Sequence, residues 1–509
     1  MNGIATAPRT QTLSAMFSGI GVVAPARDVC VSGLSVDSRS VKPGDCFFAL
    51  QGVRENGISF VAQAINNGAV AIAVNEDEQP SGLQVTANGL QVPLIVVPRL
   101  RENLGIVAAH FYGEPSRRLG VVAITGTNGK TTVAHICAQA ITALGRECGY
   151  IGTLGSGVLG RLIPFGLTTP DPIRLQADLA CMLASGQETV IIEASSHALA
   201  QYRLAGTRVT TAVFTGLGHD HLDYHASKRA YFEAKRSLFL HPGLRHAVLN
   251  AEDPASREIE RALHPDISLT TFALKHDLPR RAHEARLSLR GANYTPQESV
   301  LDIETWQGAV TIRSPLVGDI NAQNLLASLG VLLSLDVPLE VAAAALAQAT
   351  PVCGRLQKHG GTDGLPLVFI DYAHSPDSLE RVLRILRSFN PARLVCVFGC
   401  GGDRDRSKRP LMGQIAAQYA DEVIVTSDNP RSEDPTSIVR EIVAGAADVS
   451  RFTAIQDRDQ AITAALSSAA RDDIVLIAGK GHETTQEING TRLPQSDQAT
   501  VQKWIAGRT

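Results

Sequence analysis

Short apolar runs that end in glycine or a polar residue recur along this 509-residue chain, each followed by helical spacing. They include residues 119–125, 189–193, 394–398, 422–426 and 474–478. Continuous β-branched runs of this kind are typical of strands covered on both faces, as in parallel sheets. Their alternation with helices predicts an α/β fold with mostly parallel sheets.

The length exceeds what one hydrophobic core usually supports, so we expect several domains. The first hundred residues contain turn-rich pieces such as 42–45 and 66–68 around short apolar runs, which indicates a smaller α/β unit. The pattern changes again after the alanine-rich stretch 341–349. We therefore predict domains at 1–100, 101–350 and 351–509.

Composition excludes several classes of protein. With 44% hydrophobic and 19% charged residues, the chain is neither disordered nor fibrous. A net charge of -3 gives no general attraction to nucleic acid or to an anionic membrane. The eight cysteines include no CxxC pair, which argues against a zinc site or a disulfide framework. Because we find no secretory leader and no run of about 18 apolar residues, we expect a cytoplasmic protein without a membrane span.

Residues 126–132 read Gly-Thr-Asn-Gly-Lys-Thr-Thr, between a predicted strand and a predicted helix. The glycines allow a tight turn that aims amide N–H groups at phosphate oxygens, and the helix N-terminus adds a positive dipole end. Lys130 can reach the β- and γ-phosphates, and the Thr131 hydroxyl can bind Mg²⁺. Strict P-loop spacing would place glycine where this chain has Ile124. The strand–loop–helix context nevertheless predicts a bound nucleotide.

Further short motifs follow in chain order. They are 168–170 (Thr-Thr-Pro), 193–197 (Glu-Ala-Ser-Ser-His), 220–225 (Asp-His-Leu-Asp-Tyr-His), 353–355 (Cys-Gly-Arg), 371–374 (Asp-Tyr-Ala-His), 399–404 (Gly-Cys-Gly-Gly-Asp-Arg), 428–431 (Asp-Asn-Pro-Arg) and 479–483 (Gly-Lys-Gly-His-Glu). With the phosphate loop and residues 37–39 and 43–45, they resemble the motifs of the Mur ligases over nearly the whole chain. The set is most similar to the members that add diaminopimelate.

The resemblance implies three domains: a small N-terminal α/β domain for the UDP end, a central P-loop-type domain with a mostly parallel sheet for ATP, and a C-terminal Rossmann-like α/β domain for the incoming amino acid. The implied reaction joins meso-2,6-diaminopimelate to the D-glutamate γ-carboxylate of UDP-N-acetylmuramoyl-L-alanyl-D-glutamate, in peptidoglycan precursor synthesis. ATP would convert the carboxylate to an acyl phosphate, which the amine then attacks. Because two anions must approach each other, such a site needs cations and positioning. We expect a monomer.

The same motifs imply the catalytic and metal-binding residues. Thr131 and Glu193 would bind a Mg²⁺ between the β- and γ-phosphates, and His221 a second Mg²⁺ near the γ-phosphate. Lys235 would carry a CO₂-derived carbamate (N6-carboxylysine), which turns a cation into an oxygen ligand. Taken alone, Glu193 would end a strand, His221 would be a surface residue and Lys235 a solvated lysine of an amphipathic helix. Lys130 completes the catalytic set.

Three ligand sets follow from the resemblance. The ATP set is Gly126, Thr127, Asn128, Gly129, Lys130, Thr131, Thr132, Asn324, Arg355 and Asp371. The UDP-sugar-peptide set is Val36, Ser38, Thr168, Thr169, Ser195, Gln201 and Arg203. The diaminopimelate set is Arg404, Asp428, Asn429, Pro430, Arg431, Gly479 and Glu483. Arg355 and Asp371 belong to the third domain, so we expect them to arrive when that domain closes and excludes water.

Arg431 is the predicted selector of the amino acid. A guanidinium binds a carboxylate through two parallel hydrogen bonds. Meso-diaminopimelate differs from lysine chiefly by a distal carboxylate, and an unpaired guanidinium would penalise lysine. By resemblance, Arg404 serves the same ligand, and Gly479 and Glu483 its distal ammonium end.

The chain departs from the family pattern at Gly216, where asparagine is usual, and at Ala226, where glycine is common. Any contact of the missing asparagine is absent or replaced. Three alternatives stay open. A lysine-adding Mur ligase would be expected to lack Arg431, and a folylpolyglutamate synthase-like ligase would not explain 428–431 or the N-terminal domain. A P-loop switch or assembly protein would not explain Glu193 and His221.

Overall fold

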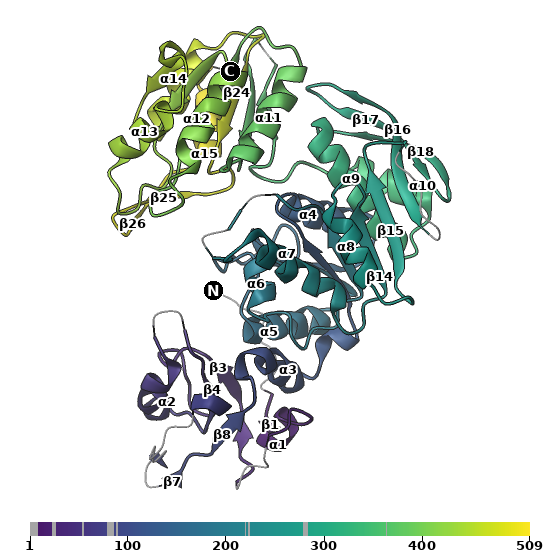
Figure 1. The fold of residues 1–509 in the computed structure, drawn as a ribbon, viewed down its shortest axis with the longest axis vertical. Helices are drawn as coiled ribbons and strands as arrows, with labels where there is room; N and C mark the ends of the chain where they lie inside the picture. Colours follow the sequence, from purple (N-terminus) through teal and green to yellow (C-terminus); the bar gives the residue numbers. More distant parts are fainter. Residues whose placement is uncertain are drawn as a thin grey trace.

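Three α/β units follow one another along the chain in the computed structural model (Figure 1). It describes residues 9–22, 27–52, 55–78, 86–87, 90–218, 220–221, 224–277, 284–362 and 364–508. Their sheets have four, ten and six strands. The prediction of an α/β fold with mostly parallel sheets is confirmed.

The N-terminal sheet has four parallel strands in the order β3-β4-β5-β8. Its strands are β3 (Gly33–Ser35), β4 (Asp45–Ala49), β5 (Ala71–Asn75) and β8 (Leu94–Val97), with α2 (Val61–Asn66) and α3 (Leu100–Tyr112) as the longer helices. Short elements are β1 (Gln11–Thr12), α1 (Leu13–Met16), β2 (Cys30–Val31), β6 (Thr86–Ala87) and β7 (Leu90–Gln91). Along β4, Cys46 and Phe48 pack into one core and Phe47 and Ala49 into another. This strand is therefore covered on both faces.

The central sheet runs in the order β11-β10-β12-β9-β13-β14-β15-β16-β17-β18. Its strands are β9 (Gly120–Thr125), β10 (Cys148–Gly152), β11 (Gly155–Gly157), β12 (Thr189–Glu193), β13 (Thr211–Phe214), β14 (His246–Asn250), β15 (Ser268–Ala273), β16 (Ala285–Tyr294), β17 (Ser299–Thr305) and β18 (Gly308–Ser314). The helices are α4 (Lys130–Ala143), α5 (Pro172–Ala184), α6 (Ser196–Ala200), α7 (Lys228–Arg236), α8 (Ala255–Ala262), α9 (Gly318–Ser334) and α10 (Leu339–Ala347). From β10 to β16 the neighbours are parallel, and the remaining pairs are antiparallel.

The C-terminal sheet runs in the order β19-β20-β24-β21-β22-β23, with only the β19–β20 pair antiparallel. Its strands are β19 (Gln357–Gly360), β20 (Leu367–Asp371), β21 (Leu394–Phe398), β22 (Glu422–Val425), β23 (Phe452–Ala454) and β24 (Ile474–Ala478). The helices are α11 (Pro376–Ser388), α12 (Lys408–Tyr419), α13 (Pro435–Val443), α14 (Arg458–Ser468) and α15 (Asp497–Ala506), and β25 (Thr485–Ile488) and β26 (Thr491–Pro494) form a hairpin.

Local chemistry explains the ends of the key helices. Gly129, in the left-handed region, precedes α4, and Gly145 follows its end with φ 71°. The Ser375 hydroxyl caps α11 in a capping box with Ser378, and Pro376 occupies the first turn. None of the described helices combines the length and apolar composition that a membrane crossing requires.

Candidate functional site

The phosphate loop lies where β9, β12, β13 and β14 end, because carboxyl ends of parallel strands share one edge of a sheet. Gly126 has φ 148°, and a side chain there would collide with the Thr215 hydroxyl. Gly129 has φ 86°, and a Cβ there would lie 2.8 Å from the Asn324 side-chain oxygen. Both positions therefore require glycine.

Two lysines converge on one carbonyl of this loop. Lys130 Nζ donates to the oxygens of Gly126 and Thr127, each at 2.9 Å, and Lys235 Nζ donates to the Gly126 oxygen at 2.8 Å. Lys235 is 1% exposed and lies 4.3 Å from the centre of the Tyr231 ring. Burial holds the pKa of Lys235 well below its ordinary value, and the charge of Lys130 lowers it further. Lys235 is therefore no solvated surface lysine.

Glu193, at the end of β12, is fully buried and fully hydrogen-bonded. Its carboxylate accepts bonds from the Thr131 hydroxyl at 2.7 Å, the Tyr150 hydroxyl at 2.5 Å and the Thr153 amide at 2.9 Å. Burial, with the nearby Glu193 charge, raises the pKa of Tyr150 well above its ordinary value. The oxygen of Glu193 that faces Thr131 is thus held beside the start of α4.

His221 lies in the loop after β13, with a left-handed φ of 55°. Its Nε2 is 3.4 Å from an Asp220 carboxylate oxygen, and its ring centre is 4.7 Å from that of His197. Leu222 and Asp223 of the same motif lie outside the described residues.

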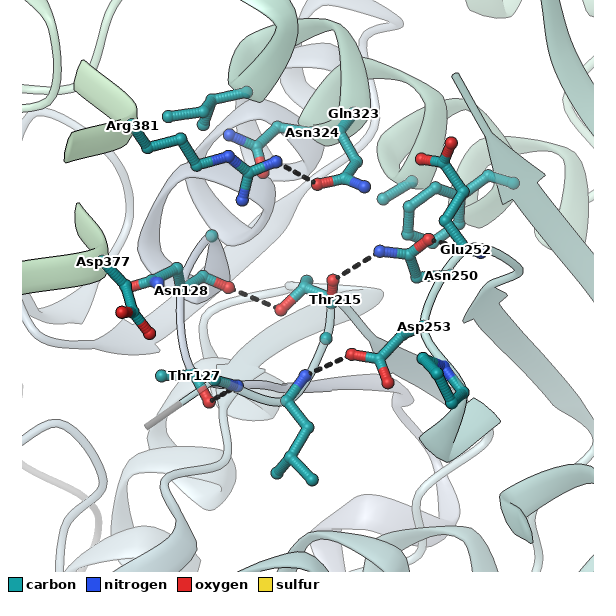
Figure 2. Close-up of a pocket in the computed structure, with 18 residues that line it drawn as sticks. Thr127, Asn128, Thr215, Asn250, Glu252, Asp253, Gln323, Asn324, Asp377 and Arg381 are labelled. Atoms are coloured by element: carbon teal, nitrogen blue, oxygen red, sulfur yellow. Dashed lines mark hydrogen bonds between the residues drawn. The ribbon is translucent and has the colours of Figure 1, made fainter. Parts of the chain in front are cut away.

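A cavity of about 430 Å³ opens beside the phosphate loop (Figure 2). Its central-unit walls are Thr127–Gly129 of the loop, Thr215–Gly218, residues of the loop after β14 and the start of α9, which includes Asn324. Asp377 and Arg381 of α11 complete it, and Arg381 donates to the Gln323 side chain at 3.0 Å across the two units. The cavity therefore has walls from two units.

Arg355 and Asp371 belong to the C-terminal unit, and neither is among the residues that line this cavity. Asp371, at the end of β20, accepts the amides of Leu356 at 2.7 Å and Ala373 at 2.8 Å, and burial raises its pKa. The Arg355 guanidinium lies 4.5 Å from the centre of the Tyr372 ring. Burial lowers the pKa of Lys130, while the charges of Glu193 and Asp220 oppose that shift and the charge of Arg355 adds to it.

Five of the residues predicted for the UDP-sugar peptide gather beside Glu193. The Thr169 hydroxyl donates to the Glu193 backbone oxygen at 2.6 Å and accepts the Ser195 amide at 3.1 Å. Arg203 donates to the Thr169 carbonyl at 2.6 Å and to the Gln201 side chain at 2.7 Å. Thr168 contacts the same cluster through Thr153.

The remaining two lie in the N-terminal unit, after β3. Val36 is 37% exposed, and the buried Ser38 hydroxyl donates to Gln63 at 2.7 Å. A cavity of about 200 Å³ at the carboxyl edge of the same sheet was not predicted. It is lined by Ala49, Leu50, Gln51, Asn75, Arg99, Leu100, Arg101, Glu102 and Tyr202, the last from the central unit.

The predicted selector lies at the carboxyl edge of the C-terminal sheet. Arg431 has φ 53°, donates to the Gly402 oxygen at 2.7 Å and has its Nε 3.7 Å from Glu487. A Cβ on Gly401 would lie 3.0 Å from Arg431 Nη1 and 3.8 Å from Arg404 Cγ. The two arginines therefore flank one glycine.

The other residues of that predicted set surround the same edge. Asn429 donates to the Glu483 carboxylate at 2.9 Å, and the buried Lys480 donates to it at 3.0 Å. A Cβ on Gly479 would lie 2.8 Å from an Asp428 carboxylate oxygen, which keeps the two strand ends in contact. The Pro430 carbonyl accepts the Glu433 amide at 3.0 Å and so closes the turn.

Three family models match successive parts of the chain. They are the Mur ligase family catalytic domain over residues 31–112, the Mur ligase middle domain over 124–332 and the Mur ligase glutamate ligase domain over 354–481. A relative from Pseudomonas aeruginosa, named UDP-N-acetylmuramoyl-L-alanyl-D-glutamate–2,6-diaminopimelate ligase, is 45% identical over 94% of this chain and 96% of its own. The chain belongs to the Mur ligase family.

Solved structures agree with the Mur ligase fold. A structure titled as the same diaminopimelate ligase is 34% identical, has a TM-score of 0.70 and covers 98% of this chain and 99% of its own. A folylpolyglutamate synthase from Mycobacterium tuberculosis, complexed with ADP and AMPPCP, is 20% identical with a TM-score of 0.61. It covers 74% of this Mur ligase and 92% of its own chain, and shares the fold alone.

Gly216 of this Mur ligase sits in a turn that is held by side chains from the end of β14 and the loop after it. The Asn250 amide donates to the Thr215 carbonyl at 3.0 Å, and Asp253 accepts the Leu217 amide at 2.5 Å (Figure 2). The Gly216 carbonyl accepts the Thr127 amide at 2.8 Å. Asn250 and Asp253 thus hold the turn in this chain, where residue 216 has no side chain to do so.

Gly216→Asn is expected to raise the KM for ATP about tenfold, because the new side chain would be strained at φ 142° and would lie 3.1 Å from Asp253. Steady-state kinetics with varied ATP check this. Gly160→Asn is the matched control, since that glycine has φ 86° and open space around it. An unchanged KM for ATP in Gly216→Asn would contradict the prediction.

Several site residues of this Mur ligase were missed in the sequence. Tyr150 and Thr153 donate hydrogen bonds to Glu193 but belong to no motif. For Tyr150 the available signal was the rule that a buried tyrosine hydroxyl usually has a hydrogen-bond partner. Lys480 lies within the motif at residues 479–483, and Glu487 follows that motif in β25 of the β25–β26 hairpin. Arg99 and Arg101 follow an apolar run, which was the available signal for the N-terminal cavity.

Proposed function

We propose that this Mur ligase joins meso-2,6-diaminopimelate to the D-glutamate γ-carboxylate of UDP-N-acetylmuramoyl-L-alanyl-D-glutamate, with ATP as the phosphoryl donor. The observation that carries the proposal is the pair Arg404 and Arg431 around Gly401, at the strand ends of the C-terminal sheet. Two arginine side chains that start there could each offer a guanidinium to a substrate with two carboxylates. The P. aeruginosa relative, a UDP-N-acetylmuramoyl-L-alanyl-D-glutamate–2,6-diaminopimelate ligase by name, supports the same substrates. A lysine-adding enzyme would have no use for Arg431.

In the proposed reaction, a γ-carboxylate oxygen attacks the γ-phosphorus of ATP and ADP leaves, which forms an acyl phosphate. The free amine then attacks the carbonyl carbon, loses a proton and expels phosphate. Residues 126–132 with Lys130 hold the phosphates, and Asn324 lies in the cavity beside them. Arg355 and Asp371 bring the C-terminal unit over the site, so water is kept from the acyl phosphate.

Magnesium ions would neutralise the phosphate charge in this site. Thr131 and Glu193 would hold one ion and His221 a second. Hydroxyl and carboxylate oxygens are the hard donors that Mg²⁺ prefers.

We further propose that Lys235 is carboxylated. Its amine would add to CO₂, with formation of an N–C bond and loss of a proton. Its burial and its contact with the Gly126 carbonyl support this, since a neutral amine is the form that reacts. The carbamate would attract Lys130, where the unmodified cation repels it.

For the UDP precursor we propose Val36 and Ser38 at the uridine end and Thr168, Thr169, Ser195, Gln201 and Arg203 near the peptide. Domains at 1–100, 101–350 and 351–509 would then serve UDP, ATP and amino acid in turn. We also propose that the protein is a monomer and that it acts in the cytoplasm, where ATP is available.

The test is ADP release from ATP, Mg²⁺ and the UDP-dipeptide with each amino acid separately. Meso-diaminopimelate is expected to support turnover, and L-lysine to be worse by about a hundredfold or more, because lysine leaves Arg431 without a carboxylate. Arg431→Ala should cost diaminopimelate use about 3 kcal/mol and leave ATP binding unchanged. Arg451→Ala, an exposed arginine, is the control. Equal turnover with both amino acids would contradict the proposal.

A further inference from the structure

Arg409 on α12 is fully buried although it carries a charge, and no motif accounts for it. Its two terminal nitrogens donate to Glu433 at 2.8 and 2.9 Å, and one also donates to Glu441 at 2.8 Å. Removing a buried guanidinium from water is unfavourable unless paired carboxylates compensate. The hydrogen bonds from Arg409 hold the pKa of Glu433 down, at about 2, so this carboxylate is charged at neutral pH.

The bonds of Arg409 join the two loops that carry the selector arginines. On the first loop, Arg409 donates to the Gly401 carbonyl at 3.1 Å, three residues before Arg404. On the second, Glu433 follows Arg431 by two residues and also accepts the Asp403 amide at 2.6 Å. Arg409 and Glu433 therefore connect both loops through charged hydrogen bonds.

Further bonds transmit this connection to Arg431 itself. The Gly402 amide donates to the Asn429 carbonyl at 2.9 Å, and Arg431 Nη1 donates to the Gly402 carbonyl at 2.7 Å. The Ser432 hydroxyl donates to Asp403 at 2.7 Å. The direction of the Arg431 side chain thus depends on where the first loop lies.

We propose that Arg409 and Glu433 are positioning residues that hold Arg431 and Arg404 in register for the carboxylates of the incoming amino acid. This inference rests on the proposed function. The planar fork of Arg409 fixes the angle between the loops, which a lysine could not do. Neither residue needs to touch the substrate.

Glu433→Gln and Glu441→Gln form a matched pair for the test. Both remove one carboxylate charge from Arg409, but Glu433 lies on a selector loop and Glu441 on α13. Glu433→Gln is expected to raise the KM for meso-diaminopimelate about tenfold with the KM for ATP and for the UDP-dipeptide unchanged. Glu441→Gln should leave all three constants within about twofold.

A purely structural role would lower Tm and turnover without a preference for one substrate. Equal KM values for diaminopimelate in the two variants would overturn the inference. If Glu433→Gln does not fold, Glu433→Asp is measured instead, and it must show the same selective rise because its shorter side chain cannot keep both loops in place. A wild-type enzyme that does not use diaminopimelate would overturn the proposed function. A wild-type enzyme that uses it, with an unselective Glu433→Gln, overturns only this inference.

Discussion

Lys130→Ala is expected to lower the turnover number by about a thousandfold, because the loop would lose the ammonium that we propose neutralises charge on the transferred phosphoryl group. The side chain is held by the carbonyls of Gly126 and Thr127, so it is oriented before the nucleotide arrives. ADP release under saturating substrates measures the effect.

The fold should survive this change, since Lys130 bonds only to its own loop among the described residues. Circular dichroism and Tm check that point, with Lys503→Ala on α15 as an exposed control. A Lys130→Ala enzyme with near-native activity would show that the phosphates bind elsewhere.

Lys235→Ala is expected to remove most activity, because the site would lose the proposed carbamate oxygen that binds Mg²⁺. Added bicarbonate or short carboxylates should partly restore turnover by filling that position. Lys235→Arg should stay inactive, since arginine keeps a charge of about +1 and does not form a carbamate. Electron density beyond Nζ in crystals grown near neutral or mildly alkaline pH is the direct observation.

The pH dependence follows from the lowered pKa of Lys235. Above that pKa the amine is neutral and can hold CO₂, and below it the proton displaces CO₂. Activity should therefore fall as the pH decreases through the lowered pKa. A fully active Lys235→Arg enzyme with a bare lysine in wild-type density would contradict the carbamate.

Much of the fold could be predicted because its signals are local. The runs at 189–193 and 474–478 are strands with every residue buried, and continuous apolar sequence is the direct mark of that environment. The start of α11 has a similarly local signal, because Ser375 caps the helix and Pro376 stands in its first turn. The three domain boundaries stay a prediction.

The site was less accessible to sequence reasoning because its contacts are distant along the chain. Helical spacing places Lys235 on the same face of α7 as Tyr231 and Phe232, but it does not show that this face docks on the phosphate loop, which is what buries the lysine. Tyr150 meets Glu193 across adjacent strands, 43 residues apart. Support of the turn at Gly216 by Asn250 depends on strand order, which no motif records. The roles assigned to the site residues stay predictions.

The cavity beside the phosphate loop has walls from two units, with Arg381 of α11 donating to Gln323 of α9, so a nucleotide bound there would couple its affinity to the position of the C-terminal unit. A ligand that contacts both walls of the cavity favours the arrangement in which the two units meet. The same arrangement raises the affinity for the ligand by an equal factor. Amino acid bound on the C-terminal unit would shift the same equilibrium. Nucleotide and amino acid can thus influence each other's affinity without touching, through the contact between α9 and α11.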